Sequence, residues 1–441
     1  MNAIGASILA MVVLVVLFGP RRWALLAMMV GVVYVPQSQQ VDVLTINMFS
    51  VRFLELAGFI RVMSRREFSF SKLNRIDRAL LLLYAFTAVV FSLRSSEGQV
   101  FVIGTAVDAW LCYFTFRGLV VDMEDFRWFL QAFVFLLAPY AVLLVIETLT
   151  KYNVFSLLGG GMYEWERQGR FRCIGSFRHP DLLGTLGASF LPLYIGLACG
   201  KTGRMRAIFA VGLCLMIVWS SNSGGSACAA AVGLAGWMCW KIRTNMRLMR
   251  WGIVGTILLA VVLMKAPVWY LLAHISGITG GDGFHRSYLM DVSFRHLNQW
   301  WFDGIPFSET MDWFPYSLMT GADITNQFIS FGLNAGVGAV GLLILLLVLA
   351  YSALGRALGS VRSHFHESSD TEYLLWGLGV MLAVHIINWF GITYFDQFYV
   401  IWFMQLAMIS SVTENAWETG PALEIDEAGA WPEEEEEVVR T

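Results

Sequence analysis

Charge is the scarcest property of this sequence. Lys, Arg, Asp and Glu make up 14% of its 441 residues, whereas hydrophobic residues make up 57%. Soluble globular domains carry roughly 25% charged residues, so the composition excludes an ordinary soluble domain. We expect a membrane protein whose partners include membrane lipids and no nucleic acid.

The motifs of metal and nucleotide sites are also missing. The chain has no Walker-type phosphate loop, no HExxH and no Cys/His spacing typical of zinc. Segment 36–45, the expected first outer turn, contains Asp42 but no acidic pair. This argues against the metal-dependent lipid-sugar transferases that carry such a pair there. We therefore expect neither a metal nor another cofactor.

A disulfide framework is not expected either. Only Cys173 lies in a predicted loop, and one exposed thiol has no partner. The other five cysteines lie in or beside apolar segments: Cys112, Cys199, Cys214, Cys228 and Cys239. The first apolar block indicates a membrane helix rather than a cleaved signal peptide.

What the chain does contain is long apolar blocks, such as Ile253–Met264 and Leu342–Tyr351. With their flanks they approach the roughly 20 residues that cross a bilayer, where only helices satisfy the backbone. We predict helices at 3–18, 23–36, 47–63, 79–93, 101–119, 128–148, 181–199, 207–220, 225–240, 251–266, 328–353, 373–391 and 395–412. The first two are short, so the expected fold is an all-α polytopic membrane bundle of about twelve to thirteen transmembrane helices.

Lysines and arginines gather in alternate connections, which the positive-inside rule assigns to the cytoplasm. Connection 61–78 is especially rich in them, whereas the short turns on the other side hold only Arg94. We predict a multi-pass protein of the bacterial inner membrane, with one domain over residues 1–412. The remaining residues, 413–441, contain the acidic run Glu433–Glu437 and are expected to form a disordered cytoplasmic tail.

Few ionisable residues interrupt the predicted membrane segments. Arg52 and Glu55 lie three positions apart and are expected to neutralise each other. Asp108 and His385 are costly in lipid, which indicates a pathway, a relay or an interhelical hydrogen bond.

Two connections on the outer side are long, at about 148–180 and 267–327, and loops on a rigid scaffold often carry function. The first ends with Arg172, Arg178 and His179 before Pro180, a residue suited to the first turn of a helix. Guanidinium groups bind phosphate in a bidentate fork, and helix N-termini favour anions. The arginines therefore indicate either a phosphorylated headgroup site or side chains that reach lipid phosphates without a substrate.

The second long loop contains a predicted helix at 285–301, which begins at His285 and Arg286 and ends at Trp301. Asp291 and Arg295 are four positions apart in it, the spacing of a surface ion pair. Trp301 is expected to anchor the loop at the membrane interface.

Asp323, Asn326 and Gln327 stand directly before the helix predicted at 328. Residues of these types cap helices. Planar polar groups beside aromatic rings also suit sugar recognition, and both interpretations remain open.

Segment 172–184, Arg-Cys-Ile-Gly-Ser-Phe-Arg-His-Pro-Asp-Leu-Leu-Gly, resembles the entry segment of the O-antigen ligase and polymerase superfamily. The second loop followed by 325–338 resembles another stretch of that family. The resemblance covers roughly residues 130–350. It implies a metal-independent glycosyltransferase that moves a glycan from undecaprenyl diphosphate to an acceptor hydroxyl, in O-antigen or exopolysaccharide biosynthesis.

When the roles of the family's residues are carried over by position, the resemblance implies that the diphosphate is bound by Arg172, Arg178 and Arg286. From their residue types, Arg295, Asn326, Gln327 and Trp301 are expected as further substrate contacts. The histidine of the family falls at Thr325, which cannot act as a base. Either Asp323, His285 or His179 would supply the base, or departure of the diphosphate would do most of the work. A second departure is Ser221-Asn222-Ser223, where the family often has Ser-Arg. These departures argue against a ligase of the usual mechanism. The stretch Asp323-Ile324-Thr325-Asn326-Gln327 resembles exopolysaccharide polymerase-like chains, which favours polymerase over ligase.

Two further interpretations compete with transfer chemistry. A transporter or flippase of a lipid-linked glycan would bind near the membrane midplane and use intramembrane charges. A non-catalytic partner of a polysaccharide export complex would use the acidic tail to dock other assembly proteins. The crowding of polar residues at the outer surface favours the enzyme.

Overall fold

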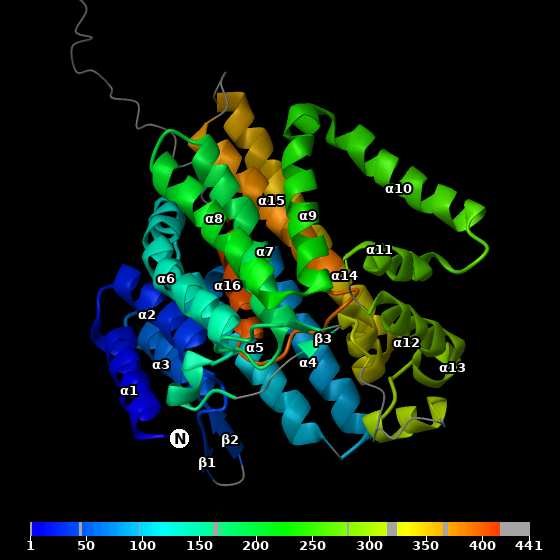
Figure 1. The fold of residues 1–441 in the computed structure, drawn as a ribbon, viewed down its shortest axis with the longest axis horizontal. Coiled ribbons are helices and arrows are strands. Elements are labelled where there is room, and N and C mark those ends of the chain that lie inside the picture. The colour runs from blue at the N-terminus through cyan, green and yellow to red at the C-terminus, as the bar shows by residue number, and fades with distance from the viewer. Residues whose placement is uncertain are drawn as a thin grey trace, which may run out of the picture.

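The computed structural model describes residues 2–43, 46–96, 98–161, 166–167, 169–279, 282–314, 324–364 and 369–414. Within this part of the chain the fold is all-α apart from two small hairpins, which confirms the predicted class (Figure 1). The first helices are α1 (Ala3–Phe18), α2 (Arg21–Tyr34), α3 (Ser50–Ser64), α4 (Arg75–Arg94), α5 (Gln99–Leu119), α6 (Met123–Thr150), α7 (Pro180–Cys199), α8 (Arg204–Ser221) and α9 (Gly224–Met238). They are followed by α10 (Met246–Leu263), α11 (Leu271–Thr279), α12 (Gly283–Arg295), α13 (Leu297–Trp300), α14 (Gln327–His364), α15 (Asp370–Asn388) and α16 (Phe398–Glu414).

Each predicted helix coincides with an observed one, but length and composition support fewer crossings than expected. Within the described residues, 8 helical stretches are long and apolar enough to cross a membrane. α9 and α10 count there as one stretch, whereas α1 and α16 are apolar but shorter. The fold is therefore that of a helical membrane protein. The total of twelve to thirteen crossings stays a prediction.

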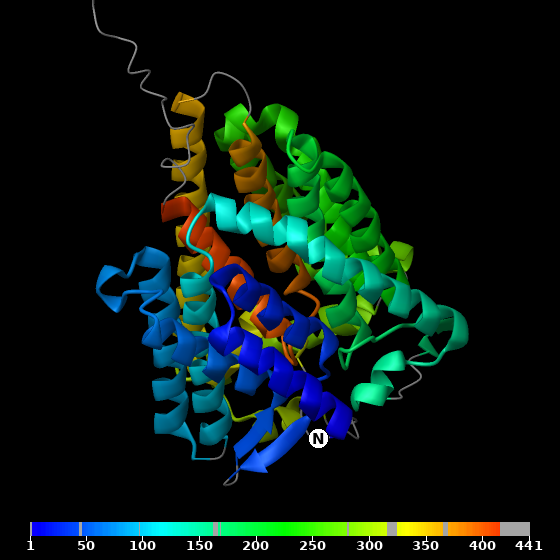
Figure 2. The same cartoon turned by 90° about the vertical axis from the view of Figure 1, so that its left-hand side faces the viewer.

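Helix α7 lies in the interior and packs against α8, α9 and α15, while α1, α2, α3 and α6 cover one flank (Figure 2). Two glycines of α7 allow the neighbouring helix α8 to approach it closely. A Cβ at Gly184 would lie 2.4 Å from the Ser221 hydroxyl, and one at Gly187 would lie 2.5 Å from the Cys214 carbonyl oxygen. The first turn of α7 is consequently held deep in the protein, and it carries part of the candidate site.

Helix α14 bends sharply at Ala335 and Gly336. Gly336 has φ +71°, and a Cβ there would lie 2.1 Å from the carbonyl oxygen of Phe302. The bend lets the backbone N–H of Val337 donate to the carbonyl of Trp301, and Arg94 donates to the carbonyls of Asp303 and Leu333. These contacts fix the first turns of α14 against the second long loop.

Both long loops are more structured than the sequence predicts. The first contains the hairpin β3 (Glu166–Arg167) and β4 (Arg170–Phe171), and the second contains α11, α12 and α13. The predicted helix 285–301 is interrupted at His296. A further hairpin, β1 (Gln40–Val43) and β2 (Ile46–Phe49), replaces the expected first outer turn. Hydrophobic contacts such as buried Trp300 explain why the second loop is folded.

Two local expectations were wrong. Cys173 is fully buried rather than exposed, because its loop folds back so that the Cys173 N–H donates to the carbonyl of Ser220. Arg52 pairs with Asp108 of α5 at 2.8 Å, not with Glu55. All six cysteines are unpaired, as expected.

Helix α10 also differs from an ordinary bundle helix, because it buries none of its residues and runs away from its neighbours (Figure 1).

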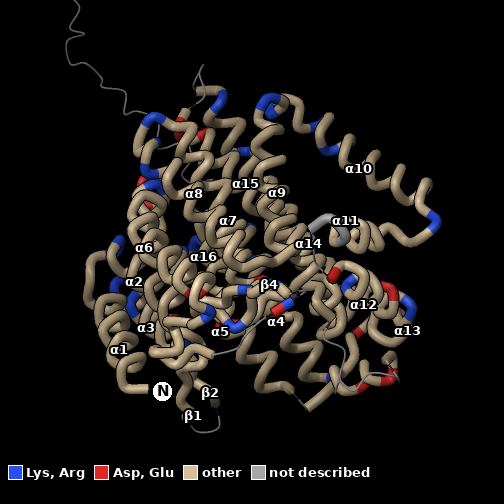
Figure 3. Tube along the Cα trace, in the orientation of Figure 1, with Lys and Arg blue, Asp and Glu red and all other residues tan. Residues whose placement is uncertain are grey.

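Many Lys and Arg residues lie at one end of the molecule, where α8 begins and α9 leads toward α10 (Figure 3). We call this the basic end, and it includes Arg204, Lys241, Arg247 and Arg250. The candidate site lies near the opposite ends of these helices. That the basic end faces the cytoplasm stays a prediction from the positive-inside rule.

Candidate substrate cavity

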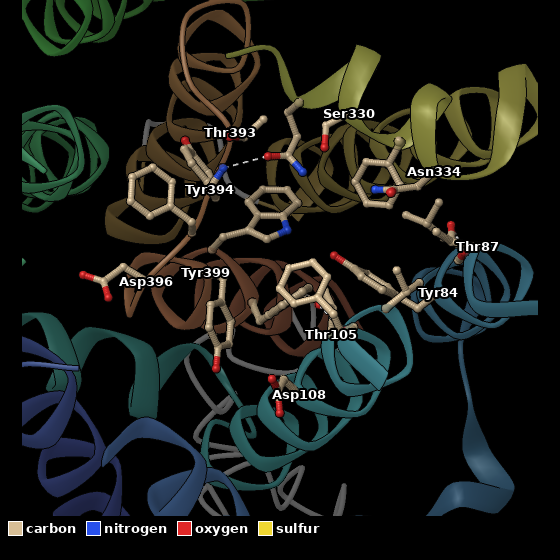
Figure 4. Close-up of a pocket in the computed structure, with 18 of the residues that line it drawn as sticks. Tyr84, Thr87, Thr105, Asp108, Ser330, Asn334, Thr393, Tyr394, Asp396 and Tyr399 are labelled. Carbon is tan, nitrogen blue, oxygen red and sulfur yellow. Dashed lines mark hydrogen bonds between the residues drawn. The ribbon is translucent and has the colours of Figure 1, made fainter. Parts of the chain in front are cut away.

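A cavity of about 420 Å³ opens between α4, α5, α14, α16 and the loop 389–397 that joins α15 to α16 (Figure 4). Its lining includes Gln37, Phe49, Arg52, Tyr84, Thr87, Thr105, Asp108, Arg178, Gln327, Ser330, Phe331, Asn334, Trp389, Tyr394, Phe395, Asp396, Tyr399, Trp402 and Phe403. Volumes of roughly 300–1,000 Å³ are typical of ligand pockets. The combination of aromatic walls and a few polar groups suits an amphipathic ligand.

The aromatic wall is rigid because its rings pack on one another edge to face. Trp389 and Trp402 lie 4.8 Å apart between ring centroids at 76°, and Tyr84 and Phe331 lie 5.8 Å apart at 73°. Edge-to-face packing is a preferred arrangement of aromatic pairs. The rings therefore present preset faces to the cavity, of the kind that sugar rings or a prenyl chain can contact.

Gln327 holds the wall in place from the start of α14. Its side-chain Oε1 accepts a hydrogen bond of 2.8 Å from the N–H of Tyr394, and its own N–H donates to the Trp389 carbonyl at 2.9 Å. A residue predicted to bind substrate thus lines the cavity and also anchors loop 389–397.

Arg178 and Asp396 form an ion pair at the edge of the cavity. The Arg178 backbone N–H donates to Asp396 Oδ2 at 3.0 Å, and its Nε lies 3.3 Å from Oδ1. The Asp396 side chain is fully buried, whereas that of Arg178 is 50% exposed. Burial raises the pKa of Asp396 to about 6, and the charge of Arg178 offsets only part of that increase.

A second guanidinium packs against the same aromatic ring as the first. The guanidinium carbons of Arg52 and Arg178 are 5.4 Å and 6.0 Å from the centroid of the Phe49 ring. Arg52 also donates to Asp108, which lines the cavity too. Among the described residues, no hydrogen bond occupies the Arg178 terminal nitrogens, so they can bind an incoming anion.

The other two predicted arginines meet elsewhere, on Asp181 in the first turn of α7. Arg172 Nη2 lies 2.5 Å from Asp181 Oδ1 and Arg286 Nη2 lies 2.6 Å from Oδ2. The Ser223 hydroxyl donates to the same carboxylate at 2.5 Å. Burial lowers the pKa of Arg172. This cluster ties both long loops to α7, and Arg178 is not part of it.

Glycines leave room for Arg286 beside the cluster. A Cβ at Gly391 would lie 2.5 Å from Arg286 Nη1, and one at Gly225 would lie 3.0 Å from it. Arg167 and Asp282 form a further pair between the loops, with Nη2 and Oδ2 at 2.9 Å.

The two predicted histidine bases do not line the cavity. His179 caps α7, where its Nδ1 accepts from the Asp181 N–H at 3.2 Å, and its ring lies against Phe395. His285 is exposed on α12. Asp323 lies outside the described residues. The hydroxyl of Thr325, which replaces the family histidine, is buried and has no hydrogen-bond partner among the described residues.

The remaining predicted residues have structural contacts. The Asn326 side chain accepts from the Ile329 N–H at 3.1 Å and thus caps α14, which agrees with the capping interpretation. Arg295 pairs with Asp291 at 2.7 Å, as its spacing predicted; the Arg295 side chain is 74% exposed, whereas Asp291 is buried. Trp301 is half exposed, and its carbonyl accepts from Val337.

Sequence reasoning missed loop 389–397, because it predicted helices over 373–391 and 395–412. The helices end at Asn388 and begin again at Phe398, and the loop between them supplies Trp389, Tyr394 and Asp396. Gly391 and Asp396 in an otherwise apolar stretch were the available signal. In the part of the chain that the structure describes, no three His, Cys, Asp or Glu side chains form a possible metal site.

Fold and cavity together define a helical membrane protein with an aromatic, partly charged cavity near one end of its bundle. No protein-family model matches the chain, and no curated protein sequence matches it. Its function is therefore inferred from the chemistry of the cavity and from the motif resemblance.

Proposed function

We propose that the protein is a membrane glycosyltransferase of polymerase or ligase type. It would move a glycan from a polyprenyl-diphosphate carrier to an acceptor hydroxyl on the outer face of the membrane, in exopolysaccharide or O-antigen biosynthesis. The observation that carries the proposal is the cavity, which combines aromatic faces, the cations Arg52 and Arg178, and the carboxylate of Asp396.

In the proposed reaction the acceptor oxygen attacks the anomeric carbon of the carrier-linked glycan. The bond from that carbon to the diphosphate oxygen breaks, and its electron pair leaves with the polyprenyl diphosphate. Arg178, assisted by Arg52, offsets the charge that develops on the leaving group, and fixed guanidinium groups can do this in a partly buried site.

Asp396 is the residue best placed to take the proton of the acceptor hydroxyl. With a pKa of about 6 it is mostly ionised at neutral pH and still basic enough to accept a proton. Its backbone φ of +55° is unusual for a residue other than glycine, and such conformations cluster at functional sites. Arg172 and Arg286 have a positioning role in this proposal, because both are engaged by Asp181.

The proposal is tested by reconstituting the purified full-length protein in liposomes with a polyprenyl-diphosphate-linked oligosaccharide. Longer glycan and released polyprenyl diphosphate are measured together. Arg178→Ala should abolish both products. Arg295→Ala, which removes an exposed arginine outside the cavity, should leave them unchanged. Full activity of Arg178→Ala would refute the proposed site.

A transporter or flippase of the same lipid-linked glycan is the second candidate. The observation that favours it is a buried polar chain inside the bundle, in which His385 Nδ1 lies 2.6 Å from the Tyr394 hydroxyl and Nε2 contacts Gln405. Polar groups at such positions often mark transport pathways or relays. Translocation of labelled lipid without formation of a glycosidic bond would support this candidate instead.

A further inference from the structure

A second hollow, of about 290 Å³, lies at the other ends of the helices that form the cavity. It is bordered by the first turn of α4, by α14 about six turns from its start, and by the end of α16. Three arginines line it, Arg75 and Arg78 from α4 and Arg356 from α14. We call it the α4–α14 groove.

The groove carries more positive charge than its own acids can offset. Arg75 and Arg78 are exposed and have no ion-pair partner among the described residues. Within the same part of the chain, Arg356 donates only to the Ser352 hydroxyl, at 2.8 Å. Among the described residues that line the groove, the one carboxylate is Glu414, which is engaged by Arg117 at 2.7 Å.

The carboxylate nearest in sequence to Arg75 and Arg78 also has partners of its own. Asp77 is buried and accepts from the Tyr113 hydroxyl at 2.7 Å and from Arg117 Nε at 3.1 Å. The Asn74 side chain accepts from the N–H groups of Ile76 and Asp77, so the N-terminus of α4 is already capped within the chain. The attraction for an anion therefore comes from the arginine side chains rather than from the helix terminus.

The walls of the groove continue into exposed apolar surface. Leu82 is one turn along α4 from Arg78 and is 52% exposed. On α14, Leu345 and Val348 are 43% and 56% exposed and precede Leu349, which lines the groove. An anion seated among the arginines can thus have hydrocarbon chains attached that lie along α4 and α14.

We propose that the α4–α14 groove binds the phosphate of an anionic membrane lipid, with Arg75, Arg78 and Arg356 around the phosphate and the acyl chains along α4 and α14. This site is separate from the substrate cavity, and the proposal does not depend on the proposed transferase activity.

The acidic run Glu433–Glu437 is the other conceivable occupant, because it follows α16, whose last residue lines the groove. A lipid fits better, since it supplies an anion and also covers Leu82, Leu345 and Val348. A glutamate run supplies only the anion.

The test measures lipid retained by the delipidated full-length protein in neutral detergent, by native mass spectrometry. The probes are phosphatidylglycerol, phosphatidylcholine and inorganic phosphate. We expect retention of phosphatidylglycerol in preference to phosphatidylcholine, and no displacement of it by inorganic phosphate. Displacement would show that the site takes a free phosphate compound and would refute the lipid as ligand.

The groove variant combines Arg75→Gln, Arg78→Gln and Arg356→Gln. Each Lys or Arg near an anionic membrane surface contributes to binding, and three together are expected to weaken retention about 100-fold. The matched control combines Arg204→Gln, Arg247→Gln and Arg250→Gln, three exposed arginines of the basic end outside the groove. An equal loss in both variants would show that any basic-end arginine suffices and would overturn the proposal.

A third variant changes all five glutamates of Glu433–Glu437 to Gln. Lipid retention equal to that of the unmodified protein is expected. Lipid that binds only after this neutralisation would show that the acidic run holds the groove, and the proposal would be wrong. Thermal unfolding of each variant confirms that a loss of lipid is not a loss of fold.

Discussion

Arg286 and Asp181 form an ion pair of 2.6 Å between residues 105 positions apart in the chain. Asp181 lies in the first turn of the central helix α7, and Arg286 lies in the second long loop. Arg172 of the first long loop shares the same carboxylate. One buried acid therefore fixes both loops beside the cavity.

Replacing that acid is expected to destabilise the protein strongly. Asp181→Ala leaves two arginines without their shared partner, and breaking a buried pair typically costs about 3–5 kcal/mol. Thermal unfolding in detergent, followed by tryptophan fluorescence, measures the loss. Glu166→Ala is the control, because Glu166 and its partner Lys151 are both exposed and surface pairs contribute about 0–1 kcal/mol. Equal shifts in the two variants would contradict the role given to Asp181.

The stability of the protein should depend on the ionisation of Asp396. The pKa of this buried carboxyl is raised from its ordinary 3.8 to about 6. The folded protein thus binds the proton more tightly than the unfolded chain does. The stabilisation is complete below about pH 4 and is lost as pH rises through about 6, an effect on the order of 3 kcal/mol.

Asp396→Asn removes this titration, because the amide stays neutral and its oxygen can still accept from the Arg178 N–H. The measurement is the difference in unfolding free energy between variant and unmodified protein at several pH values. That difference should change between pH 4 and pH 7 and be constant outside this window. A constant difference at every pH would show that Asp396 does not titrate there.

The rate of glycosyl transfer should depend on the ionisation of the same carboxyl. It should change with pH in the direction opposite to the change in stability. If ionised Asp396 accepts the proton of the acceptor, the rate falls as pH drops below about 6. Asp396→Asn should lower the rate about 10²–10⁴-fold. Its remaining activity should no longer fall between pH 7 and pH 5, as measured by release of polyprenyl diphosphate. An unchanged pH profile in the variant would assign the base to another residue.

Local patterns in the sequence predicted the helices well, because a long apolar block carries its own signal. Contacts between distant segments were not predictable in this way. Arg172 and Arg178 are six positions apart in one loop, yet they reach different acids, Asp181 and Asp396. The partner of Arg52 is Asp108 on another helix, and spacing along α3 favoured Glu55. Such partners depend on how the helices pack.

The same limit explains the missed cavity. Its wall is built from loop 389–397, whose apolar residues resemble the helices on either side. What makes it a loop is nonlocal, because its backbone is bound by Gln327 of another helix. The motif resemblance identified Gln327 and Arg178 as candidates but gave no indication of Asp396.

Gln327 should matter to both stability and ligand binding. Gln327→Ala removes the acceptor of the Tyr394 N–H and leaves a partly buried donor unsatisfied, which costs about 1–3 kcal/mol. Gln327→Glu keeps an acceptor at the same reach and should preserve more of the wall. The measurements are thermal unfolding and the KM for the lipid-linked glycan. Equal behaviour of the two variants would show that the hydrogen bond to Tyr394 does not hold the loop.

The bend of α14 offers a comparison of two glycines in one helix. Gly336→Ala places a methyl group 2.1 Å from the Phe302 carbonyl oxygen, on a backbone with φ +71°. Left-handed strain and overpacking together should cost about 2–4 kcal/mol, so the unfolding temperature should fall. Gly341→Ala meets nothing within 4 Å, and in a helix interior it should stabilise by about 0.5–1 kcal/mol. Because Gly336 lies where the second long loop contacts α14, its substitution should also lower transfer activity. If Gly341→Ala lowered the unfolding temperature as much as Gly336→Ala, the loss at both positions would come from helix packing and not from the bend.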